Sequence, residues 1–223
     1  MRGSVQAGRR SRRKEVTARM VVAKYSLSFT TAGLLQQESL GVARLFLELE
    51  DWRNVQIQVS EKNLLQARTS NTAKRVCREI ISRLKGLTRQ QMDALCEGTH
   101  QEQGYLLWLA VCKRYRFIYD FAVEVLRERF LSMEMQLRYE DYDSYFNNKA
   151  QWHEEMEVVT ETTRKKLRQV MFRMMREAEL LDKNNMIHPV ILTPSLLKCI
   201  CDDSPGHLAM FPMADMALQE GLL

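Results

Sequence analysis

Apolar residues are densest between Tyr105 and Phe130, in the stretch YLLWLAVCKRYRFIYDFAVEVLRERF. When the residues from Phe117 onward are placed at 100° per residue, the apolar ones cover about two thirds of the helical circle, and charge is confined to a narrow strip. A helix that is apolar on most sides is surrounded by other elements. We therefore predict that this stretch forms the buried centre of an all-α domain.

The same stretch also resembles a membrane segment, and its charges argue against that interpretation. Its uncharged run from Gly104 to Cys112 is far shorter than the roughly 20 residues that a helix needs to cross a bilayer. The basic run Lys113–Arg116 and the charged strip after it would lie in hydrocarbon. The pattern predicts a helix buried in protein, without membrane contact.

The most regular amphipathic pattern lies between Ser70 and Lys85. Apolar residues recur there at i, i+3, i+4, i+7, i+8 and i+11, which is one stripe of a helix. Thr69 or Ser70 is a suitable N-cap, and Gly86 follows the last residue. The apolar stripe consists of Ala73, Val76, Cys77, Ile80, Ile81 and Leu84, and the opposite side carries Asn71, Lys74, Arg75, Arg78, Ser82 and Lys85.

Two shorter helices are predicted before this one, and another after it. The first runs from Glu38 to Glu50, and Asp51 can cap the second. Thr88 can cap the helix that follows Gly86. The second helix is expected to anchor through Trp52, Val55, Ile57 and Val59.

Three helices, of which the third is capped and basic on its outer side, match the requirements of a helix-turn-helix DNA reader. In such a reader the N-terminal residues of the third helix reach base edges, and flanking cations hold phosphates. The alternative is an ordinary amphipathic helix with a solvated basic face, which is common. The predicted DNA-binding residues are Asn71, Lys74, Arg75 and Arg78, with Arg68 and Lys85 on phosphates.

The C-terminal half contains a second basic helix, predicted from about Glu157 to Leu181. Lys165 and Arg168 lie opposite its apolar stripe and are further candidates for nucleic-acid contact. Phe172 points toward the basic side, and we expect it to make a packing contact. The last segment is predicted to be a small C-terminal β-hairpin or wing, from a β-like stretch at 186–192 and a return strand at 207–213; a hairpin that simply caps the bundle is the alternative.

Composition supports helix nearly throughout, because 9 Gly and 4 Pro in 223 residues leave few breakers. The net charge of +5 is uneven: residues 1–20 carry seven Arg or Lys and one Glu. We predict a basic disordered extension at 1–20, a helix-turn-helix-like lobe at 21–98 and a C-terminal helical lobe at 99–223. The five cysteines lack a CxxC pair and are expected to be reduced thiols in the cytoplasm.

Motifs of catalysis are missing from the sequence. It contains no glycine-rich phosphate loop, no HExxH and no GxSxG. Cys199, Cys201 and His207 form an incomplete metal-ligand set. We therefore predict a protein that is not an enzyme, with no catalytic residue, no cofactor and no metal.

Several segments, taken together and in order, resemble the BrxA family of BREX bacteriophage-exclusion systems. They are YSLSFTTAGLL, EKNLLQARTSNTAKRVCREI, LLWLAVCKRYRFIYDFAVEVLRERF, DYDSYFNNKAQWH and TRKKLRQVMFRMMREAELL. The resemblance covers about Tyr25 to Ile200. It implies an all-helical fold likened to the antitermination factor NusB, a link to DNA binding, and other BREX subunits as partners.

The functional expectation is a DNA-binding component of a BREX phage-defence system that contacts duplex DNA through basic helix faces. A first alternative is an RNA-binding module of the NusB type, which would use the Lys113–Arg116 run and the face around Lys165. A second is a protein-interaction adaptor that docks other defence subunits on the acidic stretch 134–161. This stretch contains eight acids and only two basic residues, Arg138 and Lys149. Oligomeric state and sequence specificity are not predicted.

Overall fold

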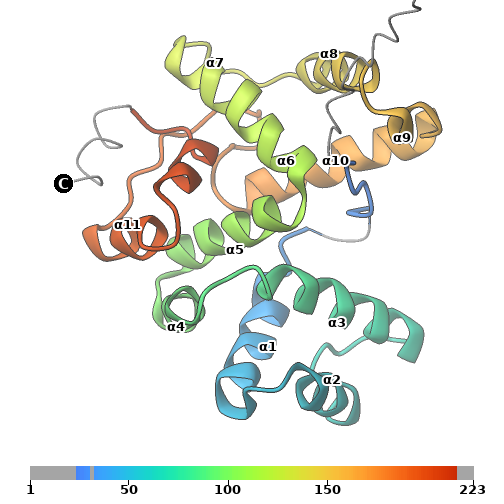
Figure 1. The fold of residues 1–223 in the computed structure, drawn as a ribbon, viewed down its shortest axis with the longest axis vertical. Coiled ribbons are helices and arrows are strands. Elements are labelled where there is room, and N and C mark those ends of the chain that lie inside the picture. The colour runs from blue at the N-terminus through green and yellow to red at the C-terminus, as the bar shows by residue number, and fades with distance from the viewer. Residues whose placement is uncertain (1–23, 31–32, 215–223) are drawn as a thin grey trace, which may run out of the picture.

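The computed structural model describes residues 24–30 and 33–214, and within these ranges the fold is helical, with no β-strand (Figure 1). The predicted extension at residues 1–20 lies outside the described residues. The helices are α1 (Gln36–Leu49), α2 (Trp52–Glu61), α3 (Ser70–Leu84), α4 (Arg89–Glu97), α5 (His100–Arg114), α6 (Arg116–Phe121), α7 (Glu128–Leu131), α8 (Tyr139–Ala150), α9 (Glu154–Glu157), α10 (Glu161–Glu177) and α11 (Pro194–Cys201).

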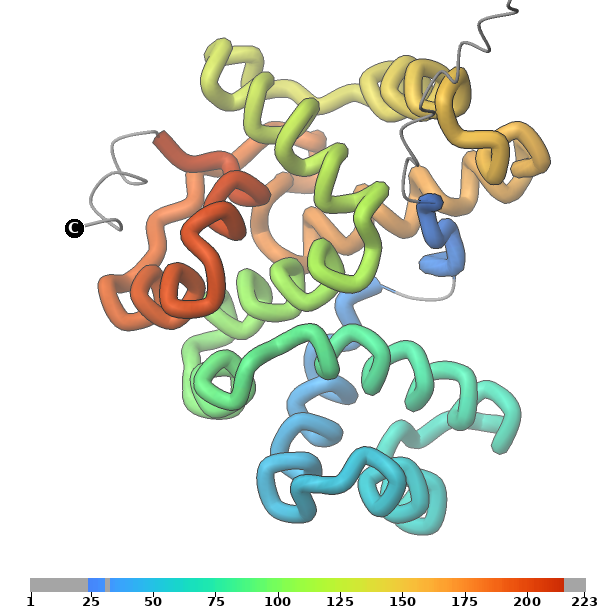
Figure 2. The backbone as a smooth tube through the Cα atoms, in the orientation of Figure 1, coloured from blue at the N-terminus to red at the C-terminus, as the bar shows by residue number. Residues whose placement is uncertain are grey.

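Helices α1, α2 and α3 pack against one another, and α4 and α5 connect them to the rest of the molecule (Figures 1 and 2). The predicted caps are confirmed: Asp51 accepts a hydrogen bond from the backbone N–H of Arg53, and Thr69 accepts one from that of Thr72. Thr88 forms a full capping box with Gln91. Ile57 is a correction, because this expected anchor of α2 is 46% exposed.

The central apolar stretch is buried as predicted, but a sharp break divides α5 from a second helical segment that comprises α6 and α7. Every residue from Gly104 to Cys112 in α5 is buried. Tyr115 then leaves helical geometry, with φ −120° and ψ 94°, and α6 begins at Arg116. A π-helical turn, Ala122–Arg127, separates α6 from α7. The break lets Tyr115 bury its ring instead of continuing the helix.

Aromatic rings from three segments fill the core of the C-terminal half. Phe117 of α6 lies 5.3–6.0 Å, between ring centroids, from Tyr25 in the entry segment and from Tyr142, Tyr145 and Phe146 of α8. The pair with Tyr145 is tilted and the other three are edge-on, which is a favoured geometry for aromatic pairs. The core therefore holds the entry segment, α6 and α8 in register.

Phe172 of α10 is fully buried and packs edge-on against Tyr139, with ring centroids 4.7 Å apart. The expected packing contact is confirmed. Helix α10 itself begins at Glu161 behind the cap Thr160, four residues later than predicted.

The predicted C-terminal β-hairpin or wing is wrong for the described residues. Only isolated bridges occur, Gln136 with Met186 and Leu181 with Ile187. Instead of a return strand, the chain forms a 3-10 helix over Pro205–Met210. The physical reason is burial: Met210 accepts a hydrogen bond on its backbone oxygen from Trp108 Nε1 at 3.1 Å, and Phe211 is fully buried. The segment seals the core beside α5.

None of the described helices combines the length and the hydropathy that a membrane span requires.

Candidate nucleic-acid interface

Helix α3 presents one buried side and one exposed basic side. Cys77, Ile80, Ile81 and Leu84 are buried, as the stripe predicts. On the opposite side, four of the predicted binding residues are exposed: Asn71, Lys74, Arg75 and Arg78. The other two, Arg68 and Lys85, are exposed at the two ends of the helix. We call these six residues the α3 basic face.

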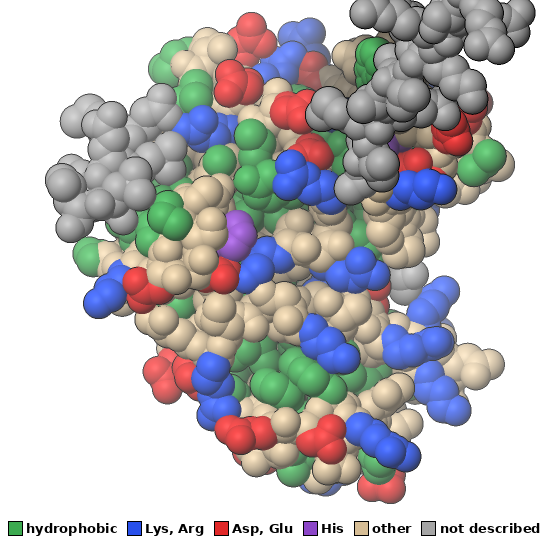
Figure 3. Space-filling view, in the orientation of Figure 1, with side chains coloured by type: hydrophobic (Ala, Val, Ile, Leu, Met, Phe, Trp, Pro, Cys, Tyr) green, Lys and Arg blue, Asp and Glu red, His purple; other side chains and the backbone are tan. Residues whose placement is uncertain are grey.

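The cations of the α3 basic face form no ion pair within the described part of the chain. Arg78 donates a side-chain hydrogen bond from Nε to the backbone oxygen of Lys74. Because these charges are not neutralised locally, they create a positive surface potential available to a polyanion. On the side drawn in Figure 3, Lys and Arg side chains gather over the outer end of the α1–α3 unit.

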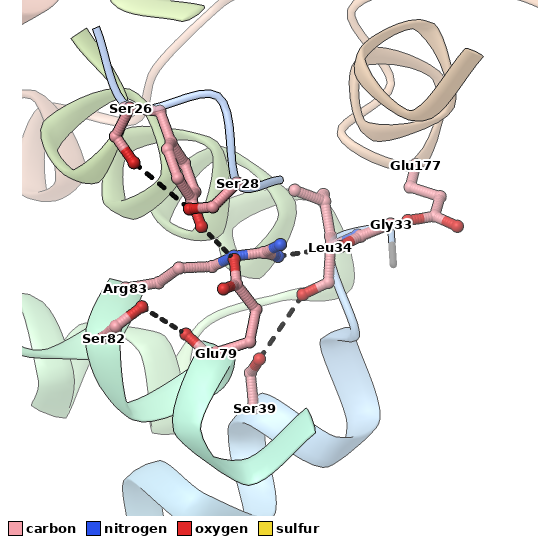
Figure 4. Close-up of polar contacts among 10 residues, drawn as sticks. Ser26, Ser28, Gly33, Leu34, Ser39, Glu79, Ser82, Arg83 and Glu177 are labelled. Carbon is pink, nitrogen blue, oxygen red and sulfur yellow. Dashed lines mark hydrogen bonds and ion pairs between the residues drawn. The ribbon is translucent and has the colours of Figure 1, made fainter. Parts of the chain in front are cut away.

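The single acid of α3, Glu79, is turned away from this face. Its carboxylate pairs with Arg83 Nε at 2.7 Å and accepts a hydrogen bond from the Tyr115 hydroxyl at 2.6 Å. Arg83 also donates from Nη1 to the backbone oxygen of Gly33 at 2.8 Å (Figure 4). Burial, together with this hydrogen bond to Glu79, raises the pKa of Tyr115 to about 12. One polar cluster thus fixes α3 to the break between α5 and α6 and removes its negative charge from the surface.

The entry segment completes the anchor. The backbone N–H of Leu34 donates to Glu177 of α10 at 2.5 Å. A Cβ at position 33 would lie 2.0 Å from Glu177 Oε2, so Gly33 permits this close approach. The Gly33–Leu34 segment therefore connects the inner side of α3 to the end of α10 (Figure 4).

The two predicted residues on α10 have different surroundings. Arg168 pairs with Asp143 of α8 and lies over the Tyr139 ring, and its side chain is only 18% exposed. Lys165 is exposed and pairs with Glu161 at 2.6 Å, one turn earlier in the same helix. Arg164, beside them, also pairs with Asp143. Lys165 and Arg168 are therefore both in ion pairs, unlike the cations of the α3 basic face.

The Lys113–Arg116 run is likewise engaged within the chain. Lys113 pairs with Asp203 at 2.6 Å and Arg116 with Asp120 at 2.8 Å. The Arg114 guanidinium lies 5.0 Å from the centre of the Tyr115 ring. A basic run in the sequence is therefore a set of internal contacts in the fold.

Helix α2 contributes residues that the sequence analysis did not single out. A groove of about 620 Å³ lies between α2 and α3, and Arg53 and Gln56 of α2 line it together with Lys74 and Arg78. The signal was present, because 53, 56, 57 and 60 follow the i, i+3, i+4, i+7 spacing of one helix side. That side contains one apolar residue, Ile57, which the apolar pattern of the sequence predicts to face inward.

Within the described ranges, no group of three His, Cys, Asp or Glu side chains is placed to hold a metal ion. His207, from the incomplete set noted in the sequence, lies 3.1 Å from Asp203 in the cluster that also holds Lys113. That position gives it a structural contact on the C-terminal segment.

The fold and the site together define a helical protein with an exposed, locally unneutralised basic helix. A family model named BrxA matches residues 23–204, and the chain belongs to the BrxA family. A "BREX protein BrxA" from Escherichia coli O9:H4 (strain HS) is 26% identical over 163 residues, which cover 72% of this chain and 76% of that protein.

A second "BREX protein BrxA", from Bacillus cereus (strain H3081.97), is 28% identical over 127 residues, covering 55% of this chain and 64% of that protein. Among solved structures, an uncharacterized protein from Magnetospirillum magneticum superimposes with a TM-score of 0.71 at 19% identity, over 85% of this chain and 98% of that one. This last likeness concerns the fold alone.

Proposed function

We propose that this chain is a non-enzymatic, cytoplasmic DNA-binding component of a BREX phage-defence system, and that the α3 basic face contacts duplex DNA. The observation that carries the proposal is the sorting of charge on α3. Five exposed cations at positions 68, 74, 75, 78 and 85 lack ion pairs within the described residues, and Glu79 is held inside. Membership of the BrxA family supplies the BREX context.

The geometry supports binding that is dominated by phosphate contacts. The connection between α2 and α3, residues 62–69, is longer than the 3–4-residue turn of an ordinary helix-turn-helix. The helix-turn-helix assignment is therefore a likeness of arrangement, with α3 in the place of the recognition helix. Asn71, near the N-terminus of α3, is the residue best placed to reach a base edge.

The test is a triple substitution, Lys74→Ala with Arg75→Ala and Arg78→Ala. Loss of three phosphate contacts should lower duplex affinity by roughly 100-fold and reduce the slope of log K against log salt by about 2.7. The matched control removes the same charge from α10, as Lys165→Ala, Lys166→Ala and Arg173→Ala. Mobility-shift assays that show equal losses for both variants would mean that only net charge matters, and unchanged affinity of the first variant would refute the proposal.

The RNA-binding alternative treats the fold as NusB-like and relies on the Lys113–Arg116 run. The internal pairing of Lys113 and Arg116 leaves that run little free charge, which favours the DNA proposal. Competition between a duplex and a structured RNA of equal length distinguishes the two. Preference for RNA that persists in the α3 triple variant would support the alternative.

The adaptor function is a second candidate, because an aromatic side chain is exposed beside unpaired acids. Trp152, after α8, is 76% exposed, and Val158 is 82% exposed. Glu154 and Glu157, between them in the chain, are exposed and form no ion pair within the described residues. Exposed Trp is typical of interface hot spots, and the acids suit a basic surface on another BREX subunit.

Co-purification with each BREX subunit tests the adaptor function. Trp152→Ala should remove a specific association, whereas Ile191→Ala, which deletes an equally exposed apolar group elsewhere, should not. An association that survives Trp152→Ala would exclude this surface.

A further inference from the structure

The groove between α2 and α3 combines cations with an apolar floor. Arg53 of α2 and Lys74 and Arg78 of α3 line it, and none of the three forms an ion pair within the described residues. Ile57 and Cys77 line it as well. Ile57 is the notable member, because it is 46% exposed, whereas Val55 and Val59 of the same helix are buried.

A sugar–phosphate backbone on its own would use only half of such a groove. Its phosphates would pair with the three cations, but its polar surface would gain nothing from covering Ile57. A nucleobase has two apolar faces, and burying one on Ile57 removes apolar area of both partners from water. The amide of Gln56, on the same side of α2, supplies a donor and an acceptor for a base edge.

The shape of the groove selects the state of that base. The surface between α2 and α3 is a concave groove. A base that is stacked and paired in a duplex cannot enter a concave site, whereas an unpaired base can leave the stack and enter it.

We propose that the α2–α3 groove binds one unpaired nucleotide next to the duplex that the α3 basic face holds. Arg53, Lys74 and Arg78 neutralise its phosphates, Ile57 covers a face of its base, and Gln56 contacts the base edge. The inference rests on the proposed DNA binding and adds a ligand class to it, DNA with a bulged, gapped or displaced base.

Three DNA probes of one length test the ligand: an intact duplex, the duplex with a single-nucleotide bulge, and the same bulge with an abasic residue. The full chain should bind the base-containing bulge about 10-fold more tightly than the duplex, since one base contact is typically sufficient for such a ratio. The abasic bulge gives the DNA the same bend and the same number of phosphates, but it has no base to enter the groove. Equal affinity for the two bulges would overturn the inference.

Two substitutions test the site. Ile57→Ser should reduce the ratio of bulge to duplex affinity to less than about 2. Leu64→Ser is the matched control, because Leu64 is 42% exposed in the next loop and does not line the groove, so it should keep the full ratio. A ratio that survives Ile57→Ser would overturn the groove assignment. Absence of any DNA binding by the unaltered chain would instead refute the proposed function itself.

Discussion

Helices α3 and α10 are both amphipathic and basic, yet they expose very different amounts of free charge. Along α10, Arg164 and Arg168 share Asp143, Lys165 pairs with Glu161, and Arg173 pairs with Glu177. Along α3 the one ion pair within the described residues is Glu79 with Arg83, and it is buried. The number of basic residues in a helix therefore does not define a polyanion-binding surface, because the positions of the acids decide which charges remain.

The source of the difference is the neighbouring element. Helix α10 packs beside the acidic α8, which supplies Asp143, and its Arg side chains cover the rings of Phe146 and Tyr139. Their charge serves the packing of two helices. Helix α3 instead packs against the break at Tyr115, whose hydroxyl and the buried Arg83 retain Glu79 inside. Both helices carry cations, but in α3 the acid Glu79 lies on the inner side of the helix, away from the exposed cations.

The largest expected effect is on the anchor of α3. Glu79→Gln removes the charge that balances Arg83, whose side chain is 3% exposed, so a buried cation is left without a counter-charge. We expect a loss of about 3 kcal/mol in the free energy of unfolding and a fall in Tm of roughly 6 to 12 °C for a chain of this size. Calorimetry measures both. Glu61→Gln, at an exposed acid of α2, is the control and should change Tm by less than about 1 °C.

A second substitution would make α10 resemble α3. Asp143→Ala frees Arg164 and Arg168, which are about 20% exposed, and should cost about 2 kcal/mol of stability through the loss of two half-buried pairs. The freed cations should also raise duplex affinity about 3-fold, with a steeper salt dependence. Asp202→Ala makes the same change in net charge at an exposed position, and it should alter neither the stability nor the duplex affinity. Unchanged stability after Asp143→Ala would mean that solvent, and not Asp143, balances these arginines.

The contrast also explains how far the sequence could be interpreted. Periodicity and capping residues predicted α1 to α4 and the buried side of α3, because these features depend only on residues close in the chain. The caps at Asp51, Thr69 and Thr88 are confirmed. The partner of Arg168 lies 25 residues away in α8, and no local spacing indicates it. The C-terminal 3-10 helix was missed for the same reason, since its burial depends on Trp108 of α5. Exposure of the α3 residues followed from their pattern, and their binding role stays a prediction.

A matched pair of charge reversals compares the two helices directly. Arg75→Glu acts on an exposed arginine with no ion pair within the described residues, and Arg173→Glu acts on one that is 64% exposed but paired with Glu177. Reversal at Arg75 should weaken duplex binding about 10-fold, because it removes a phosphate contact and adds a repulsive charge. Reversal at Arg173 should change it less than about 2-fold. Equal effects in a fluorescence-anisotropy titration would remove the distinction between the helices.

The smallest expected effect is a pH dependence of stability that belongs to the α3 anchor. Burial and the hydrogen bond to Glu79 raise the pKa of Tyr115 to about 12 in the folded chain, from an ordinary value of about 10. A raised pKa means that the folded state holds the proton more tightly than the unfolded state. The resulting stability is complete below about pH 10 and is lost as the pH rises through the folded value.

Tyr115→Phe isolates this contribution, because all other titrating groups are common to both proteins and cancel in the difference. Urea unfolding at about pH 8 and about pH 11 should show the stability advantage of the unaltered chain shrinking by about 1 kcal/mol between the two. Glu79→Gln in the chain that retains Tyr115 should reduce the pKa shift of Tyr115, since the Glu79 carboxylate is one of its causes. A stability advantage that grew with pH would show that the folded chain favours the Tyr115 phenolate. A phenolate cannot donate a hydrogen bond to Glu79, so the buried carboxylate would then need another donor.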